Sequence, residues 1–530
     1  MKDINNYQQM LRDGKINRRD FIARMTALGV ASSAMGGLIV SADALAETPK
    51  RGGRVKLGWY THSANDTLEP ARLTTSLDFQ RAYTVMNTLV RWDRELKPIP
   101  DLAVEWDAEQ SGKIWNFKLR QGVTFHNGKD LTPNDVIFSI QQHLGDDSKS
   151  IIKAWLAGIT DMKAVGNDTV RITLDAPNAD LPMYFGDMHS AIHPEGHTDW
   201  DNAMGTGPFK LKSFKPGVGM LAVRNENYWD EGRPYVDEIE SFGIGETAAR
   251  LNALLAGDVH FICRIDPKTV DLIKQHPTSA FEPTSSARHV TFPMLADREP
   301  FANDDLRLAM KYLADRESML NVVQQGHGSI ANDVSLGPND RYYCRELEQR
   351  VYDVDKAKFH LKKAGYESGF SYDLHTSEAA AGTTAPDLAV HFRETAAAAG
   401  ADINVVKHPA DGYWSAVWMK QNFCMSNWFP RPTADLRFSL CNLSDANWNE
   451  GAYRDPKVDE LVLKARGTLD GPERAAIYCD VQKILHDKDG RIIPLFIDFL
   501  DARSQDLKGY VSHPFAEGAG CRLADEVWLG

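Results

Sequence analysis

The sequence predicts an α/β fold built from more than one domain. At 530 residues, the chain is longer than a single hydrophobic core normally supports. Strand-like runs in which apolar and polar residues alternate, as at residues 114–120, are interspersed with helical patterns. Helical patterns at residues 249–257 and 384–400 each end at a glycine and pass into a strand-like run. A hydrophobic fraction of 43% with 25% charged residues is typical of a globular protein.

Residues 1–46 predict an export signal. Arg18 and Arg19 precede a moderately apolar stretch at residues 25–40, and an A-x-A cleavage pattern ends at Ala46. This arrangement is similar to a twin-arginine (Tat) signal peptide. No cysteine lies near the cleavage pattern, so a lipid anchor is not expected. We therefore expect Tat export, cleavage near Ala46 and a periplasmic protein.

The net charge and the cysteine spacing each argue against one class of function. A formal net charge of -13 argues against nucleic acid, whose phosphates need a basic face. None of the six cysteines has the spacing of a CxxC motif or a zinc site. Disulfides are permitted in an exported protein. Cys424 and Cys441 flank one short segment and can close a loop, and a set of buried thiols is the alternative.

The most ordered block of the sequence spans residues 103–136. A short alternating run is broken by turn residues, and a second alternating run follows at residues 114–120. Asn127-Gly128 is a strong tight-turn signal, and Thr132 and Pro133 are typical of a helix start. The block predicts a hairpin, a turn and a capped helix. His126 and Asp135 are interpreted as framework residues within it.

The other elements follow from the same signals. In chain order they are a strand at 54–59, a helix at 77–90, a strand at 168–174, a helix at 249–257, an amphipathic helix at 301–320, helices at 352–365 and 384–400, a strand at 402–406, two helices within 461–486 and a short buried strand at 492–497.

Four blocks of the chain resemble the family 5 solute-binding proteins of ABC importers. The first reads W-N-F-K-L-R-Q-G-V-T-F-H-N-G and continues to the "LTPNDV" helix start. The others are "GTGPF" followed by "NENYW", the "DLRLAMKYLADR" helix, and "YDVDKAKFHLKKAGY". They occur in the order of that family over roughly 450 residues. The resemblance implies a two-lobed periplasmic binding protein fold (class II, cluster C type) with an extra subdomain in the first lobe.

The resemblance also implies discontinuous domains. We expect the first lobe to comprise residues 47–86, a subdomain at 87–204, and residues 205–285. The second lobe is expected at 286–500, and the chain is expected to return to the first lobe at 501–530. Such lobes close over a ligand by hinge motion.

No enzyme motif is present. The sequence lacks G-x-S-x-G, H-E-x-x-H, a Walker loop and a dinucleotide-binding glycine motif after a strand. His189 and His193 are four residues apart, but on a stretch interrupted by glycine and proline rather than on a helix. The sequence therefore predicts no catalytic residue, no metal site and no cofactor.

Arg431 is the leading ligand-binding candidate. In peptide binders of the family, an aspartate in the loop after a "G-W" strand pairs with the peptide ammonium. Aligned on Trp428, that place falls on or beside Arg431. A guanidinium repels an ammonium and forms two-pronged hydrogen bonds with a carboxylate. The alternative is that Arg431 pairs with Asp435 and braces its own loop.

The remaining candidates come from the same resemblance: Trp428, Trp414, Tyr60, Asn427 and Arg288. The resemblance to the family implies a monomer that captures a small polar solute, such as a peptide, an opine or a related conjugate, and delivers it to ABC permease subunits in the inner membrane. Two alternatives stay open: a Tat-exported enzyme, and a haem or metal-chelate binder on the same fold.

Overall fold

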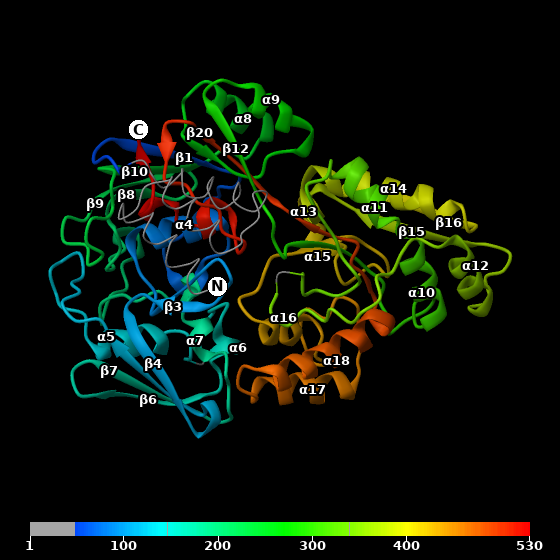
Figure 1. Ribbon diagram of the computed structural model, residues 1–530, viewed down its shortest axis with the longest axis horizontal. Coiled ribbons are helices and arrows are strands. Elements are labelled where there is room, and N and C mark those ends of the chain that lie inside the picture. The colour runs from blue at the N-terminus through cyan, green and yellow to red at the C-terminus, as the bar shows by residue number, and fades with distance from the viewer. Residues whose placement is uncertain (1–47, 146, 339) are drawn as a thin grey trace, which may run out of the picture.

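The computed structural model describes residues 48–145, 147–338 and 340–530, and it is a two-lobed α/β protein. Figure 1 shows the lobes side by side, with the segment from the green-yellow α10 to the orange α18 forming the right-hand lobe. The predicted export signal and its cleavage site lie outside the described residues. No helix in the described residues is long and apolar enough to cross a membrane.

A seven-stranded mixed sheet forms the first lobe. Its order is β12-β20-β11-β1-β10-β9-β8. The central β1 (Arg54–Trp59) runs parallel to both of its neighbours, and Val55, Leu57 and Trp59 are buried. The other strands are β8 (Phe209–Lys215), β9 (Gly219–Arg224), β10 (Glu238–Gly243), β11 (Phe261–Ile262), β12 (Ser279–Thr284) and β20 (Phe499–Ser504).

Helices cover this sheet. The main ones are α4 (Ser76–Val85), which packs against β8, β9 and β10, and α8 (Thr247–Leu255) and α9 (Val270–Gln275), which pack against β11 and β12. The predicted helix at 77–90 is correct in place but ends earlier. Met86 is extended, and the chain continues into the short β2 (Val90–Trp92), which pairs with β3 (Pro98–Pro100).

A four-stranded antiparallel sheet forms the lower left part of Figure 1. Its strands are β4 (Ala103–Glu109), β5 (Ile114–Leu119), β7 (Thr169–Leu174) and β6 (Ile159–Val165), in that order. The predicted alternation is confirmed, since Phe117 and Leu119 are buried whereas Lys118 is exposed. The predicted capped helix is α5 (Pro133–Gln141), where Thr132 and Asp135 form a reciprocal capping box.

The second lobe combines two small sheets with several helices. One sheet has the order β14-β19-β13-β17, with β18 also paired to β13, and β15 and β16 form a parallel pair. The elements are β13 (His289–Pro293), α10 (Asp304–Leu313), α11 (Arg316–Ser318), β14 (Gly328–Ile330), α12 (Val354–Lys363), β15 (Phe370–Thr376), α13 (Glu378–Ala381), α14 (Ala385–Ala397), β16 (Ala401–Lys407), α15 (Tyr413–Ala416), β17 (Ser426–Trp428), α16 (Ala434–Cys441), α17 (Pro456–Arg466), α18 (Pro472–Lys488), β18 (Arg491–Ile492) and β19 (Leu495–Ile497).

Two predicted elements of this lobe are broken in the structure. The helix expected at 301–320 begins at Asp304 and is interrupted at Ala314, whose backbone is extended. The strand expected at 492–497 is split into β18 and β19. Pro494 lies at the break, and a proline cannot donate a ladder hydrogen bond.

The chain crosses between the lobes at residues 285–288 and again at Asp498. The two crossings are bonded to each other, because the Ile497 amide donates to the Arg288 carbonyl at 2.7 Å and the Ser286 hydroxyl donates to the Ile497 carbonyl at 2.8 Å. Two short connections joined in this way are typical of a hinge.

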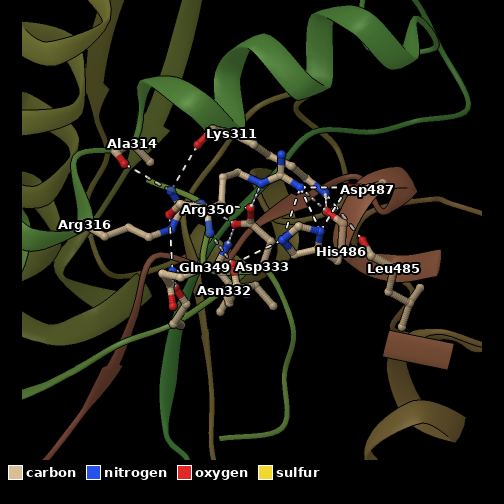
Figure 2. Close-up of polar contacts among 12 residues, drawn as sticks. Lys311, Ala314, Arg316, Asn332, Asp333, Gln349, Arg350, Leu485, His486 and Asp487 are labelled. Atoms are coloured by element: carbon tan, nitrogen blue, oxygen red, sulfur yellow. Dashed lines mark hydrogen bonds and ion pairs between the residues drawn. The ribbon is translucent and has the colours of Figure 1, made fainter. Parts of the chain in front are cut away.

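A buried ion-pair cluster orders the segment between β14 and α12 (Figure 2). Both oxygens of Asp333 accept hydrogen bonds from Arg316, at 2.7 and 2.8 Å, and one also accepts from Arg350 at 2.9 Å. Arg350 reaches Asp487 on α18 at 2.9 Å. The cluster ties three parts of the second lobe together.

The structure shows which cysteines form a disulfide, a question that the sequence left open. Cys344 and Cys479 form a disulfide that joins the same segment to α18. Cys424 and Cys441 are both free and buried, so the predicted loop closure is wrong and the alternative of buried thiols holds for this pair. Cys441 ends α16, where its thiol donates to the Arg437 carbonyl, whereas Cys424 lies in the central apolar cluster of the second lobe.

Candidate ligand-binding cleft

A cavity of about 240 Å³ lies between the lobes at the hinge. The first lobe contributes Tyr60 and Arg264 to its wall, and the second lobe contributes His327 and the loop at residues 381–384. Both crossings reach it, through Arg288 on one and Asp498 on the other. The cavity is therefore enclosed by elements that move relative to each other when a hinge opens.

Arg264 forms the first-lobe wall, and its charge is already compensated. It is ion-paired with the buried Glu517 and lies over the ring of Tyr60, with its guanidinium carbon 4.3 Å from the ring centre. The same carbon is 5.0 Å from the ring centre of Phe429 in the second lobe. Burial alone would lower the pKa of Arg264, but Glu517 raises it above its ordinary value. Arg264 thus connects the two lobes beside the cavity.

Arg288 is 7% exposed, yet its guanidinium has no hydrogen bond or ion pair with any described residue. Its Nε is fully buried without a partner. Burial, together with the charge of Arg264, lowers the pKa of Arg288 to about 9, so it stays charged at neutral pH. The charge of Glu517 opposes this shift, but no hydrogen bond or ion pair joins Glu517 to Arg288 within the described residues. A buried cation without a hydrogen-bonded anion is costly, and a ligand carboxylate would relieve that cost.

Arg431 has a similar environment in the loop after β17. Within the described part of the chain its buried Nε has no partner, and its guanidinium donates one hydrogen bond, to the Pro430 carbonyl at 3.3 Å. Burial lowers the pKa of Arg431, and the charge of Asp187 in the first lobe opposes this shift. That carboxylate is bonded to His189 at 2.5 Å rather than to Arg431.

The alternative in which Arg431 pairs with Asp435 is wrong. Asp435 is bound by Arg466 of α17, with both of its oxygens 3.1 Å from the Arg466 Nε, and it accepts a hydrogen bond from Tyr184 at 3.1 Å. Thr433 caps α16 at this point, and the Asp435 side chain faces α17 and the first lobe. Among the residues that the structure describes, no carboxylate is bonded to Arg431.

The other predicted residues are placed differently. Trp428 is 4% exposed and donates to Glu450 at 2.7 Å, so it supports the loop that carries Arg431. Asn427 donates to the Ala380 carbonyl and holds α13 against the cavity. Trp414 is 42% exposed on α15, does not line the cavity, and packs edge-on against Trp418.

Sequence reasoning missed Asp498. It is half-buried, lines the cavity, and makes no hydrogen bond or ion pair with any described residue. Burial raises its pKa to about 6. A signal was present, because Asp498 is the single charged residue in the apolar run at 492–500. The first-lobe pair Arg264 and Glu517 gave no such signal, because 253 positions separate the two residues in the sequence.

Comparisons with known proteins agree on one family. The model of the bacterial extracellular solute-binding proteins, family 5 (middle region), matches residues 97–450. Heme-binding protein A of Haemophilus influenzae is 27% identical, over 82% of this chain and 86% of the relative. The periplasmic binding protein DppA of Helicobacter pylori, solved with the peptide STSA, has a TM-score of 0.77 at 21% identity, over 92% of this chain and 99% of that one. The binding protein AgaA of A. tumefacien R10, solved with agropinic acid, has a TM-score of 0.76 at 21% identity, over 90% and 99%.

Proposed function

This chain belongs to family 5 of the bacterial extracellular solute-binding proteins, and we propose that it is the periplasmic binding component of an ABC importer. In this proposal it captures a small polar solute that carries a carboxylate, such as a peptide or an opine, and delivers it to permease subunits in the inner membrane. The two-lobed fold and the hinge beside the cavity support capture by closure.

The observation that carries the proposal is a pair of arginines to which no carboxylate of the described residues is bonded. Arg288 lines the cavity between the lobes, whereas Arg431 lies in the loop after β17, is only partly buried and does not line that cavity; each has a buried Nε that no described group satisfies. Leaving such a group unpaired costs free energy that a bound carboxylate would recover through charge-assisted hydrogen bonds. Peptides present such a carboxylate, and the solved DppA structure holds a peptide.

A thermal-shift screen tests this function. A solute that binds the closed form should stabilise it by mass action, by about 2.7 kcal/mol at one hundred times its Kd. We expect a few strong shifts among peptides, opines and related amino-acid conjugates. Native mass spectrometry of the protein as purified serves as a second readout, because a retained solute would be seen directly.

The same screen separates the alternatives. Haem and a nickel–histidine chelate are included, since Heme-binding protein A is among the relatives. A shift with haem alone, together with its absorbance band, would replace the carboxylate proposal by the haem alternative. The absence of any shift, together with turnover of a chromogenic substrate, would favour the exported enzyme.

We also propose Tat export, which rests on the sequence of residues 1–46. Replacing both Arg18 and Arg19 by lysine should leave full-length precursor in the cytoplasm, because the Tat pathway reads the arginine pair. Cell fractionation and immunoblotting measure this. Unchanged periplasmic accumulation would show that the segment works through another route.

A further inference from the structure

We propose that Asp498 binds an ammonium group of the solute, while Arg288 binds its carboxylate. Asp498 would therefore select solutes that carry an ammonium group. This inference rests on the proposed function and deepens it. The preferred solute would carry both charges, as amino acids and peptides with a free amino terminus do.

Six charged residues line the cavity, and four of them already have partners. Arg264 is paired with Glu517, and Arg250 donates to backbone carbonyls of residues 244, 245, 263 and 264. Glu378 is paired with Lys407 at 3.0 Å, and Asp266 accepts hydrogen bonds from Thr383 and from the Lys268 amide.

The remaining two are Arg288 and Asp498, and neither has a partner among the described residues. They lie on the two crossings, which are bonded to each other at 2.7 Å through the Arg288 carbonyl and the Ile497 amide. They do not form an ion pair with one another in the described structure, although their charges are opposite. A cavity of about 240 Å³ is thus lined by one group that can bind an anion, Arg288, and one that can bind a cation, Asp498.

A solute with both charges satisfies both groups at once. Its carboxylate accepts from the Arg288 guanidinium, and its ammonium donates to the Asp498 carboxylate. A dicarboxylate would satisfy only Arg288 and would be repelled by Asp498. The raised pKa of Asp498, about 6, fits a carboxylate that lacks a cationic partner in the ligand-free protein.

A competition experiment tests the proposal on the full mature protein. The protein is incubated at about pH 7.5 with a casein hydrolysate mixed with the same hydrolysate after N-acetylation. Retained species are identified by native mass spectrometry. The wild-type protein should retain free-amine species over their acetylated forms by about thirty-fold or more, which is the effect of losing one partner of a buried charge pair.

Asp498→Asn should abolish that preference while keeping retention of acetylated species. Glu282→Gln is the matched control. Glu282 lies on β12 beside the hinge strand β20 and is bound to Arg503 at 2.8 Å, but it does not line the cavity. It should keep the wild-type preference. Equal retention of both forms by the wild-type protein, or an unchanged preference in Asp498→Asn, would overturn the proposal.

Arg288→Gln tests the other half of the site. It should lose retention of free and acetylated species alike, and its ligand-free melting temperature should not fall, because an unpaired buried cation has been removed. A lower melting temperature with unchanged retention would mean that Arg288 braces the hinge, and would overturn its assigned role.

A pH series adds a readout that a purely structural role would not produce. Affinity for the best free-amine species should fall below about pH 6 in the wild-type protein, as Asp498 takes up a proton, but not in Asp498→Asn. The other charged or titratable groups at the cavity are unchanged between the two proteins, so only the difference between their pH profiles reports on Asp498. These groups are Tyr60, Arg250, Arg264, Asp266, Arg288, His327 and Glu378. Parallel pH profiles would contradict the proposal.

The experiments distinguish a failure of this inference from a failure of the proposed function. Retention of nothing from either hydrolysate overturns this inference, because the solute is then not of the amino-acid or peptide type. The proposed function fails only if the wider panel of carboxylates also gives no thermal shift.

Discussion

The protein buries arginine in two different ways. In the second lobe, Arg316 and Arg350 surround the fully buried Asp333 and bind it directly (Figure 2). Arg288 at the cleft and Arg431 in the loop after β17 each have a buried Nε as well, but no carboxylate of the described residues binds them. Burial alone would raise the pKa of Asp333, and its arginines hold it below the ordinary value instead. The paired arginines hold the second lobe together, whereas the unpaired ones are those that we propose bind the solute.

The largest expected effect is on the paired cluster. Asp333→Ala leaves Arg316 and Arg350 buried without their anion, which should destabilise the protein by about 3–5 kcal/mol. Denaturant unfolding followed by circular dichroism measures this. Asp498→Ala is the matched control, since it removes a carboxylate with no partner and should cost less than about 0.5 kcal/mol. Similar losses in the two variants would remove the distinction between the regions.

Arg431→Ala should give the opposite pattern. Affinity for the solute found by the screen should fall by about 2–5 kcal/mol, with the ligand-free melting temperature nearly unchanged. Arg431→Lys should restore only part of the affinity, because the two-pronged geometry is lost. Isothermal titration calorimetry and thermal unfolding measure the two quantities.

Arg466→Ala provides the contrast to Arg431→Ala. It leaves Asp435 buried without its cation and should therefore lower the melting temperature. If Arg431→Ala also lowers the melting temperature and leaves the affinity for the solute unchanged, Arg431 is a structural residue. The inference of an anionic solute group at this position must then be dropped.

Asp501 offers a third test, as a buried carboxyl group without a bonded cation. It is 1% exposed and accepts hydrogen bonds from Tyr510 and the Gly518 amide. Burial raises its pKa to about 7, so the folded protein holds this proton well above the pH of about 3.9 at which an unfolded chain loses it. Between these values the folded state binds more protons, and its stability from this group falls as pH rises.

Asp501→Asn cannot ionise, so wild type should lose about 2 kcal/mol relative to this variant between about pH 5.5 and 7. Urea unfolding at several pH values measures the difference. Asp506→Asn, at an exposed position, serves as the control and should follow wild type. A constant difference between wild type and Asp501→Asn would show that Asp501 is already ionised across this range.

The smallest effect is expected at the surface between the lobes. Lys268 and Asp387 form an exposed ion pair across the cleft at 2.8 Å. Exposed pairs contribute about 0.2–1 kcal/mol, so Lys268→Ala should weaken solute binding by no more than about fivefold, and only at low salt. A larger loss would mean that closure depends on surface pairs as much as on the buried arginines.

Much of the local structure follows from the sequence. The alternation in β5 and the Thr132–Asp135 capping box are made by residues a few positions apart, so their hydrogen bonds can be predicted from spacing. The four family blocks predict the two-lobed fold, which the family match and the solved relatives confirm. Arg431 was singled out because its residue type departs from the family pattern.

Only the tertiary structure decided which charged groups are paired. Asp435 is four positions from Arg431, yet it binds Arg466, 31 positions away, because α17 brings that guanidinium to it. The sequence left open whether Cys424 and Cys441 close a loop or stay buried thiols, and it did not indicate the disulfide that the packing of α18 forms between Cys344 and Cys479 across 135 positions. Arg288 and Asp498 line the same cavity at the hinge although about 210 positions separate them. The strength of a charge in the cleft depends on burial and on its partners, and both are set by segments that the linear sequence does not place together.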